Sequence, residues 1–568
     1  MARRRTFALL PLLVVLAGCS PEDGEVRDSA VPTDSEAEDT ASVDTGAIDS
    51  TVSDSAPSDT GAADSSGTDT SILADTGAID TSVSSETGGD GGAACTPTPA
   101  PVVTKVGVVG KVLLKGTVVT ADTFFVGEVL VEGDTITCAA ASCSASAGAA
   151  TASVVETNGI ILPGLIDTHN HILFDIFDET DWAPTKAYGN HDQWPGEARY
   201  GAMVDAKQWL NNEAGPTPRP DIGCEMDKFG ELKGIVAGTT SIAGSANVAN
   251  KACYGSLART IDQTPNDLGS DKVQAATIFP TKTSADGVCG NFADGSTTAY
   301  LIHIAEGVDT TALNEFAKLG TITTTPNCLY APQTTIVHGT ALGDAELTTM
   351  ASKGMKLTWS PRSNVYLYGG GTDLTKTTKI PLAIAKGINV AIAPDWSMGG
   401  SQNMLDELRY ADKVDNSAFG DKLTPKMLFQ MATINAAKNV ALDAVIGSIA
   451  VGKKADLMVI GGDATAPYDA LLKATPRDVR LTMVGGVALY GDKAIQSIAP
   501  TTPACETIDV CCASKFVCVA ESGGTTTNKF GQTYAEIKAA IEKGLTDYDA
   551  LALTTWKFAP STPLVRCP

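Results

Sequence analysis

Short apolar runs rich in β-branched residues recur along the chain between about residues 100 and 490. Two early runs, at 102–120 and 124–137, and two late ones, at 446–462 and 479–491, are punctuated by glycine and predict short strands that pair into one side domain. Between these flanks, strand-like runs alternate with helical stretches. Repeated alternation of this kind predicts an α/β fold with a parallel sheet or barrel over residues 161–445.

The N-terminus has the pattern of an export signal. Residues 1–19, MARRRTFALLPLLVVLAGC, combine a cationic start with an apolar run too short to span a bilayer. The ending Leu16–Cys19 resembles the lipobox of bacterial lipoproteins, so we expect a lipid on Cys19; the alternative is an ordinary signal cut near Ala17. Ser20 favours an outer-membrane lipoprotein of the cell envelope, with a surface-exposed position as one option. This lipid anchor is the only membrane contact that the sequence predicts.

A long acidic linker follows. The chain carries 41 basic and 66 acidic residues, a net charge of −25, and residues 20–94 alone hold 18 acidic residues against one basic residue. Residues 20–98 are mostly Asp, Ser, Thr, Ala and Gly, a composition that cannot bury enough apolar surface to fold. We therefore predict a disordered tether, and the acidic balance argues against nucleic acid as a partner.

The region 501–568 reads as a separate C-terminal extension. It contains five cysteines, and it contains a helix predicted to begin with a capping box at Thr533 and Glu536 and to end at Gly544. An exported chain with 13 cysteines is expected to form disulfides. The natural candidates are Cys138 with Cys143, five positions apart, and the C-terminal group, whose pairing the sequence leaves open.

The placement of the histidines is the most informative chemical signal, because the chain contains only five. His169 and His171 lie two apart at the end of a predicted strand, so both imidazoles share one face. His303, His338 and Asp395 each follow another apolar run. Barrel strands present functional groups at their C-terminal ends, so these side chains are expected to converge on a metal site.

Several motifs resemble the amidohydrolase superfamily of metal-dependent hydrolases. They are PGLIDTHNH, AGTTS, HIAEG, IVHGT, SPRSN, the APDW run, MATINAA and GSIAVGKKADLMVI. The resemblance implies a distorted (β/α)8 TIM barrel at 161–445 and a small β-sandwich formed by residues 99–160 and 446–500. His303 followed by Glu306 resembles the HxxE of the cytosine deaminase and triazine chlorohydrolase-like branch, which generally binds one metal.

The resemblance also implies residue roles. His169, His171, His303 and Asp395 look like ligands of one divalent ion, Zn²⁺ or Fe²⁺, which suits three imidazoles and a carboxylate. The ion would activate a water, and Glu306 would take its proton. His338 would polarise the substrate or orient the nucleophile, and Asp395 is also a candidate proton shuttle.

Two further interpretations concern weaker candidates. Lys282 follows the fourth predicted strand and, if carboxylated, would bridge two metals as in the binuclear members of the superfamily. The long loop after the first barrel strand carries Trp182, His191 and Trp194, which either contact a planar small-molecule substrate or pack the loop onto the barrel.

The predicted function is a metal-dependent hydrolase of non-peptide carbon–nitrogen bonds, either a deaminase or a cyclic amide hydrolase. The alternatives are a binuclear amidase or dipeptidase and a surface-tethered, non-catalytic binding protein on the same scaffold. The sequence leaves the substrate and the oligomeric state open.

Overall fold

The computed structural model describes residues 99–245, 248, 257–263, 266, 268–269, 272–500, 505–519 and 532–567. The predicted signal segment with Cys19 and the whole of the predicted linker lie outside these ranges. In the described part of the chain, every helix falls short of the length and apolar character needed to cross a bilayer.

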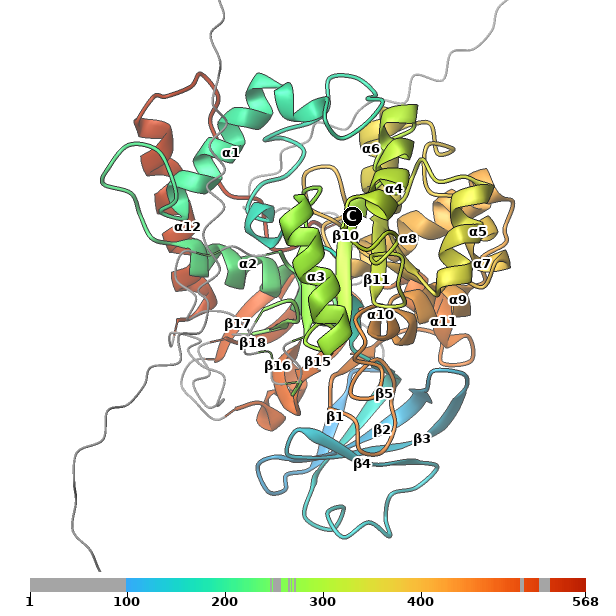
Figure 1. The fold of residues 1–568 in the computed structure, drawn as a ribbon. Coiled ribbons are helices and arrows are strands. Elements are labelled where there is room, and N and C mark those ends of the chain that lie inside the picture. The colour runs from blue at the N-terminus through green and yellow to red at the C-terminus, as the bar shows by residue number, and fades with distance from the viewer. Residues whose placement is uncertain are drawn as a thin grey trace, which may run out of the picture. The chain divides into compact units, whose positions relative to one another are not determined.

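The two flanking regions join in one ten-stranded sheet (Figure 1). Its order is β17-β18-β16-β15-β14-β5-β2-β3-β4, with β1 paired to β5. The strands are β1 (Val102–Lys105), β2 (Lys111–Val119), β3 (Phe124–Glu132), β4 (Thr135–Ala140), β5 (Ser153–Pro163), β14 (Leu457–Ile460), β15 (Val479–Val484), β16 (Val487–Asp492), β17 (Cys505–Val510) and β18 (Ala513–Cys518).

The strands of the predicted side domain are hydrogen-bonded into one continuous sheet. Strand β5 pairs along its length with β2 on one side, and its last residues pair with β14 on the other. One long strand therefore ties the early and late halves into a continuous sheet. Val129, Leu457 and Phe516 from both halves share one apolar core, which stabilises this domain by burial.

Eight parallel strands form the remainder of the β structure. They are β6 (Leu165–Asp167), β7 (Thr239–Ile242) and β8 (Arg259–Thr260) in one sheet, and β9 (Val273–Ala276), β10 (Ala299–Ile304), β11 (Thr334–His338), β12 (Lys356–Trp359) and β13 (Val390–Ile392) in another. Strands β10 and β11 are buried throughout, as expected for parallel strands covered on both faces.

The parallel strands form an open version of the predicted barrel. A parallel bridge between Asn170 and Asp395 joins the ends of β6 and β13 at one seam. At the other seam, β8 pairs only with β7 and β9 only with β10 among the described residues, so the barrel does not close between β8 and β9. Strand β8 is only two residues long and offers little backbone for pairing.

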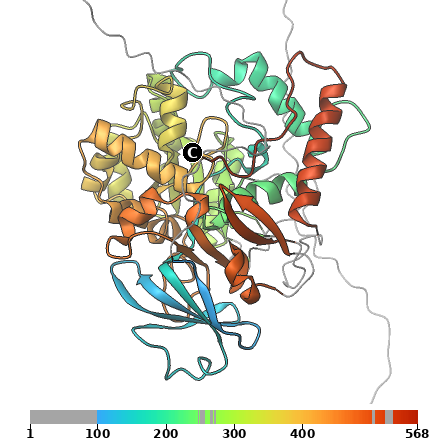
Figure 2. The same cartoon turned by 180° about the vertical axis from the view of Figure 1, so that it is seen from behind.

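Helices separate most of the parallel strands in sequence, although the described residues show none between β7 and β8 or between β8 and β9. They are α1 (Ala198–Leu210), α2 (Gly223–Ile235), α3 (Lys282–Asp294), α4 (Thr310–Thr321), α5 (Asp344–Lys353), α6 (Pro361–Tyr368), α7 (Ile380–Ala385), α8 (Met404–Val414), α9 (Pro425–Met431) and α10 (Ile434–Asn439); α11 (Pro467–Lys473) and α12 (Tyr534–Ala550) come later. Figure 2 gives the same arrangement from behind. The alternation places the C-terminal ends of the strands at a common edge.

The C-terminal region joins the rest of the fold. Strands β17 and β18 form a hairpin, and β18 pairs with β16 at the sheet edge. Helix α12 begins with the predicted capping box but continues beyond Gly544 to Ala550, which corrects the predicted end. A Cβ at Gly544 would lie 2.6 Å from Ile222 Cδ1 and 2.7 Å from Leu210 Cδ2, so this glycine allows close helix packing instead of ending the helix.

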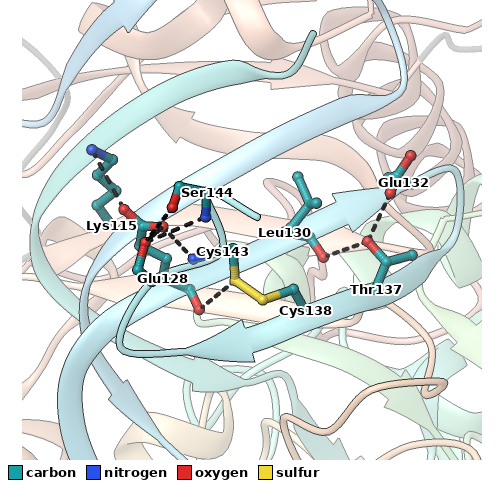
Figure 3. Close-up of a disulfide and its surroundings, with 9 residues drawn as sticks. Lys115, Glu128, Leu130, Glu132, Thr137, Cys138, Cys143 and Ser144 are labelled. Atoms are coloured by element: carbon teal, nitrogen blue, oxygen red, sulfur yellow. Dashed lines mark hydrogen bonds and ion pairs between the residues drawn. A yellow bond between two sulfur atoms is a disulfide. The ribbon is translucent and has the colours of Figure 1, made fainter. Parts of the chain in front are cut away.

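Disulfides cross-link the described chain at the pairs that the sequence suggested and elsewhere. Cys138 pairs with Cys143, where Glu128 Oε2 accepts a 2.6 Å hydrogen bond from the Cys143 amide (Figure 3). The C-terminal pairs are Cys505–Cys518, across the β17–β18 hairpin, and Cys511–Cys567. The sequence did not single out a further pair, Cys289–Cys328, which links α3 to the segment before β11.

Candidate active site

The predicted metal ligands meet at the C-terminal ends of the parallel strands. Three overlapping groups of side chains could each hold a metal ion, and within each group the ring nitrogens or carboxylate oxygens lie within 4.8 Å of one another. The groups are His169, His171 and His303; His169, His338 and Asp395; and His303, Glu306 and His338. His338 and Asp395 adopt left-handed backbone conformations, with φ of 64° and 74°. Such conformations cost about 1–3 kcal/mol each and are concentrated at functional sites.

Asp395 is the centre of the ligand group. Its Oδ1 lies 2.8 Å from His169 Nε2 and 3.5 Å from His171 Nε2, and its Oδ2 accepts a 2.5 Å hydrogen bond from Ser363 Oγ. Backbone bonds fix the spacing, because the His171 amide donates to the Asp395 carbonyl at 2.7 Å. The strand ends, and not side-chain packing alone, therefore hold these groups together.

The outer contacts of two histidines orient their rings. His303 Nδ1 lies 3.1 Å from the Ala276 carbonyl and donates to it, which leaves Nε2 as a lone-pair donor for a metal. The Asn364 amide donates to His338 Nδ1 at 3.1 Å, which places the His338 proton on Nε2, 3.7 Å from Glu306 Oε2. His303 is thus prepared as a ligand, and His338 as a hydrogen-bond donor.

Burial keeps the imidazole rings of the cluster neutral. It lowers the pKa of His169 to about 3; it also lowers that of His171 to about 3 and that of His303 to about 4, with help from the neighbouring His169. Neutral imidazole is the form that binds metal, and three imidazoles with one carboxylate match the ligand chemistry of Zn²⁺ or Fe²⁺. The residues present therefore fit a divalent ion.

Glu306 lies beside this cluster and is 4% exposed. Its Oε1 accepts a 2.7 Å hydrogen bond from the Tyr368 hydroxyl, and its Oε2 faces His338 Nε2 at 3.7 Å and His191 Nδ1 at 3.4 Å. A carboxylate held next to a metal-ligand group is suited to accept and donate protons.

His191 reaches the site from the loop after β6. Its Nε2 lies 2.6 Å from Glu315 Oε1 and its Nδ1 lies 3.4 Å from Glu306 Oε2. Burial opposes a charged ring here, but the hydrogen bonds and charges of Glu306 and Glu315 outweigh it and raise the pKa of His191 to about 11. The structure places His191 against the predicted proton-transfer residue, whereas the sequence suggested a substrate contact or packing of the loop onto the barrel.

The two predicted aromatic contacts have different positions. Trp182 is fully buried, donates to Glu197 Oε2 at 2.9 Å and packs against Tyr200 with ring centroids 4.9 Å apart, so it supports the loop and does not face a substrate. Trp194 is half-buried, with its ring 5.4 Å from that of Trp396. Trp396 in turn lies 5.5 Å from the His171 ring and forms an aromatic wall beside the ligands.

Lys282 is not part of the site. It begins α3, its side chain is 57% exposed, and its Nζ pairs with Asp286 Oδ2 at 2.6 Å and with Thr324. An exposed amine paired with a carboxylate on its own helix cannot bridge metals among the buried histidines. The structure thus corrects the alternative of a carboxylated lysine.

Sequence reasoning missed several supporting residues. Ser363 and Asn364 lie in the SPRSN motif, and Trp396 directly follows Asp395. The sequence therefore pointed to these motifs, but it did not show that Ser363 bonds Asp395 or that Asn364 bonds His338. Glu315 and Tyr368 lie on helices and carry no recognisable local signal. Only the tertiary arrangement brings these two to Glu306 and His191.

Comparison with known families places these residues in context. The Amidohydrolase family matches residues 231–489, a range that includes His303, Glu306, His338 and Asp395 and begins after His169 and His171. The 5'-deoxyadenosine deaminase of Methanothermobacter thermautotrophicus is 24% identical over 357 residues, 59% of this chain and 80% of that protein. Human guanine deaminase is 32% identical over 149 residues, which cover 25% of this chain and 32% of that protein.

Solved structures support the fold. An atrazine chlorohydrolase of Arthrobacter aurescens in complex with zinc has a TM-score of 0.52 at 16% identity, covering 69% of this chain and 96% of that one. Guanine deaminase of Bradyrhizobium japonicum has a TM-score of 0.51 at 17% identity, covering 68% of this chain and all of that one. These neighbours imply a TIM-barrel-like α/β fold. The family match and the relatives show that this chain is similar to members of the amidohydrolase superfamily.

Proposed function

We propose that this protein is a metal-dependent hydrolytic deaminase of amino-substituted, purine-like heterocycles. The family match and the deaminase relatives support the broader class, a metal-dependent hydrolase of carbon–nitrogen bonds. The observation that carries the proposal is the position of Glu306, a buried carboxylate next to a cluster of neutral imidazoles and Asp395.

His169, His171, His303 and Asp395 would hold the ion. A divalent ion held there would lower the pKa of water and so would supply a hydroxide nucleophile at neutral pH. Glu306 accepts a proton from the nucleophile and delivers it to a ring nitrogen, while the His338 Nε2–H donates a hydrogen bond to the reacting centre. Asp395, held by Ser363, is placed to pass a second proton to the leaving ammonia. The net change is replacement of C–NH₂ by C=O with release of ammonia.

The aromatic wall favours a flat ring as substrate. Trp396 lies beside His171, and Trp194 packs against Trp396, so the indole rings border the ligand cluster on one side. Aromatic faces bind planar heterocycles through dispersion and offset stacking. The named relatives act on adenosine derivatives and on guanine, which supports the same chemical class for this chain.

A deamination screen tests the proposal. The purified protein, loaded with zinc or iron(II), is incubated with 5'-deoxyadenosine, 5'-methylthioadenosine, S-adenosylhomocysteine and guanine, with cyclic ureas and N-acyl amino acids as other classes. We expect ammonia release from at least one aminated heterocycle and no turnover of the N-acyl amino acids. Turnover of only the cyclic ureas would identify a cyclic amide hydrolase, and inactivity throughout would favour a binding protein.

We also propose a single metal per chain. Three histidines and Asp395 satisfy one ion, and the only bridging lysine that the sequence suggested lies elsewhere. Metal analysis of the purified protein should give close to one equivalent of zinc or iron. A stable content of two equivalents would contradict the proposal.

We propose in addition that the enzyme is tethered to the outer membrane through Cys19. The support is the Leu16–Cys19 motif after a short apolar run, followed by the acidic linker. Labelling with a palmitate analogue and membrane fractionation should detect lipidated protein, and Cys19→Ala should move the protein to the soluble fraction. Unlabelled wild-type protein would indicate the ordinary signal cut instead.

A further inference from the structure

His191 stands apart from the other four histidines, because it belongs to none of the groups whose atoms converge for a metal in the described part of the chain. Each of its ring nitrogens faces a carboxylate, with Nε2 2.6 Å from Glu315 Oε1 and Nδ1 3.4 Å from Glu306 Oε2. The side chains of His191, Glu315 and Glu306 are only 17%, 15% and 5% exposed. The imidazole therefore bridges two largely buried carboxylates, one at the end of β10 and one on α4.

The loop around His191 is built to make this contact. The His191 amide donates to the Glu306 carbonyl at 3.2 Å, and Asn190 Nδ2 donates to Asp309 Oδ2 at 2.7 Å. Gly307, with φ of 148°, lets the two segments approach, because a Cβ there would lie 2.6 Å from Asn190 Cα. The loop after β6 is thus docked on the segment that carries Glu306.

Glu315 fixes the other side of the same segment. Its Oε2 accepts a 2.8 Å hydrogen bond from the Ala305 amide, while its Oε1 bonds His191. Ala305 has φ of 58°, a left-handed conformation that a non-glycine residue rarely adopts without support. Glu315 therefore holds the backbone immediately before Glu306 together with the ring that contacts the Glu306 carboxylate.

We propose that His191 and Glu315 form a positioning pair that fixes the Glu306 carboxylate for proton transfer. The inference rests on the proposed function, in which Glu306 is the proton-transfer group. Tyr368 holds Glu306 Oε1 at 2.7 Å, so the pair determines where the second oxygen, Oε2, points. Further titratable groups facing this arrangement are His338, 3.7 Å from Glu306 Oε2, the exposed Asp192, 3.8 Å from His191 Nε2, and Tyr200, which interacts electrostatically with Glu306.

The pair acts on the proton-transfer step and not on substrate binding. Loss of an outer residue that orients a reacting group typically costs about 10–100-fold in activity. Glu315→Gln and His191→Ala should each lower kcat by about 10–100-fold and change KM by less than about threefold. Asparagine places its amide near the position of Nδ1, so His191→Asn should recover part of the activity that His191→Ala loses.

A control separates positioning from loop stability. Gln193 Oε1 accepts a 2.9 Å hydrogen bond from the Gly189 amide within the same loop, and no described contact joins Gln193 to Glu306. Gln193→Ala should leave kcat close to wild type. Equal losses of kcat in Gln193→Ala and His191→Ala, or a loss confined to KM, would overturn the proposal.

A measurement without substrate keeps this inference distinct from the proposed function. The measurement is an NMR spectrum of zinc-loaded protein with ¹⁵N-labelled histidine. The ring-nitrogen signals of His191 are identified by their loss in His191→Asn. Their chemical shifts should change in both Glu306→Gln and Glu315→Gln. Inactivity of the wild type with shifted signals would refute the proposed reaction but keep the contacts. Signals that respond to neither substitution would refute the positioning pair, whatever the wild type hydrolyses.

Discussion

Replacement of Glu306 by glutamine isolates proton transfer from metal binding. Glutamine has nearly the same shape, so its side-chain oxygen can still accept the 2.7 Å bond from Tyr368, but it cannot accept a proton at neutral pH. General acid–base groups contribute about 10²–10⁴-fold to rate, which corresponds to about 2.7–5.5 kcal/mol of the barrier. We expect a fall in kcat of that size.

The structure also predicts what stays unchanged in this variant. The proposed metal ligands are His169, His171, His303 and Asp395, so zinc content should remain near one equivalent and the melting temperature should change little. The assay is steady-state ammonia release together with metal analysis. Glu346→Gln is a matched control, because Glu346 caps α5 through the Gly343 amide and has no role at the site. A kcat within threefold of wild type, or loss of zinc, would refute the assignment of Glu306.

Three further predictions follow from other contacts. Asp395→Asn removes the charged ligand, so zinc affinity should fall by more than the roughly 10–100-fold that loss of a residue behind a ligand costs. Competition with a chelator measures this affinity, and an unchanged value would exclude Asp395 as a ligand. The pKa of His191 is raised to about 11 in the folded protein. The charged ring therefore makes its full contribution to stability at pH values below the ordinary histidine pKa, and this contribution is lost as pH rises through about 11. The loss of unfolding free energy in His191→Gln should therefore be larger at pH 6 than at pH 10 in urea titrations, and a pH-independent difference would contradict this assignment. Gly544→Leu forces a side chain against Leu210 and Ile222 and should cost at least about 1–3 kcal/mol, measured as a lower melting temperature, whereas an unchanged value would mean that α12 does not pack as described.

Local patterns sufficed for much of the candidate site. Buried parallel strands are continuous apolar runs, and the polar residue that ends each run is visible in the sequence at His169, His303, His338 and Asp395. Because parallel strands share the direction of their ends, convergence follows from the strand order alone. The same reasoning misplaced Lys282, since a residue six positions beyond a strand can turn onto a surface helix.

Contacts between distant elements could not be predicted in this way. The loop after β6 has no periodicity that shows where it docks, so His191 could be noticed but not placed against Glu306 and Glu315. The continuation of α12 past Gly544 depends on helices that lie more than 300 residues earlier in the chain. The continuity of the sheet between the early and late segments depends on how β5 pairs along both of its edges.

The sequence by itself determined which residues could bind a metal and at which strand ends they would lie, because strand periodicity and ligand chemistry are local properties. Only the tertiary structure decided which carboxylate is held for proton transfer, by which partners, and where the barrel stays open. Those features depend on close packing between segments far apart in the chain, where a glycine, a loop docking or a shared strand edge selects one arrangement, and no local pattern records that choice.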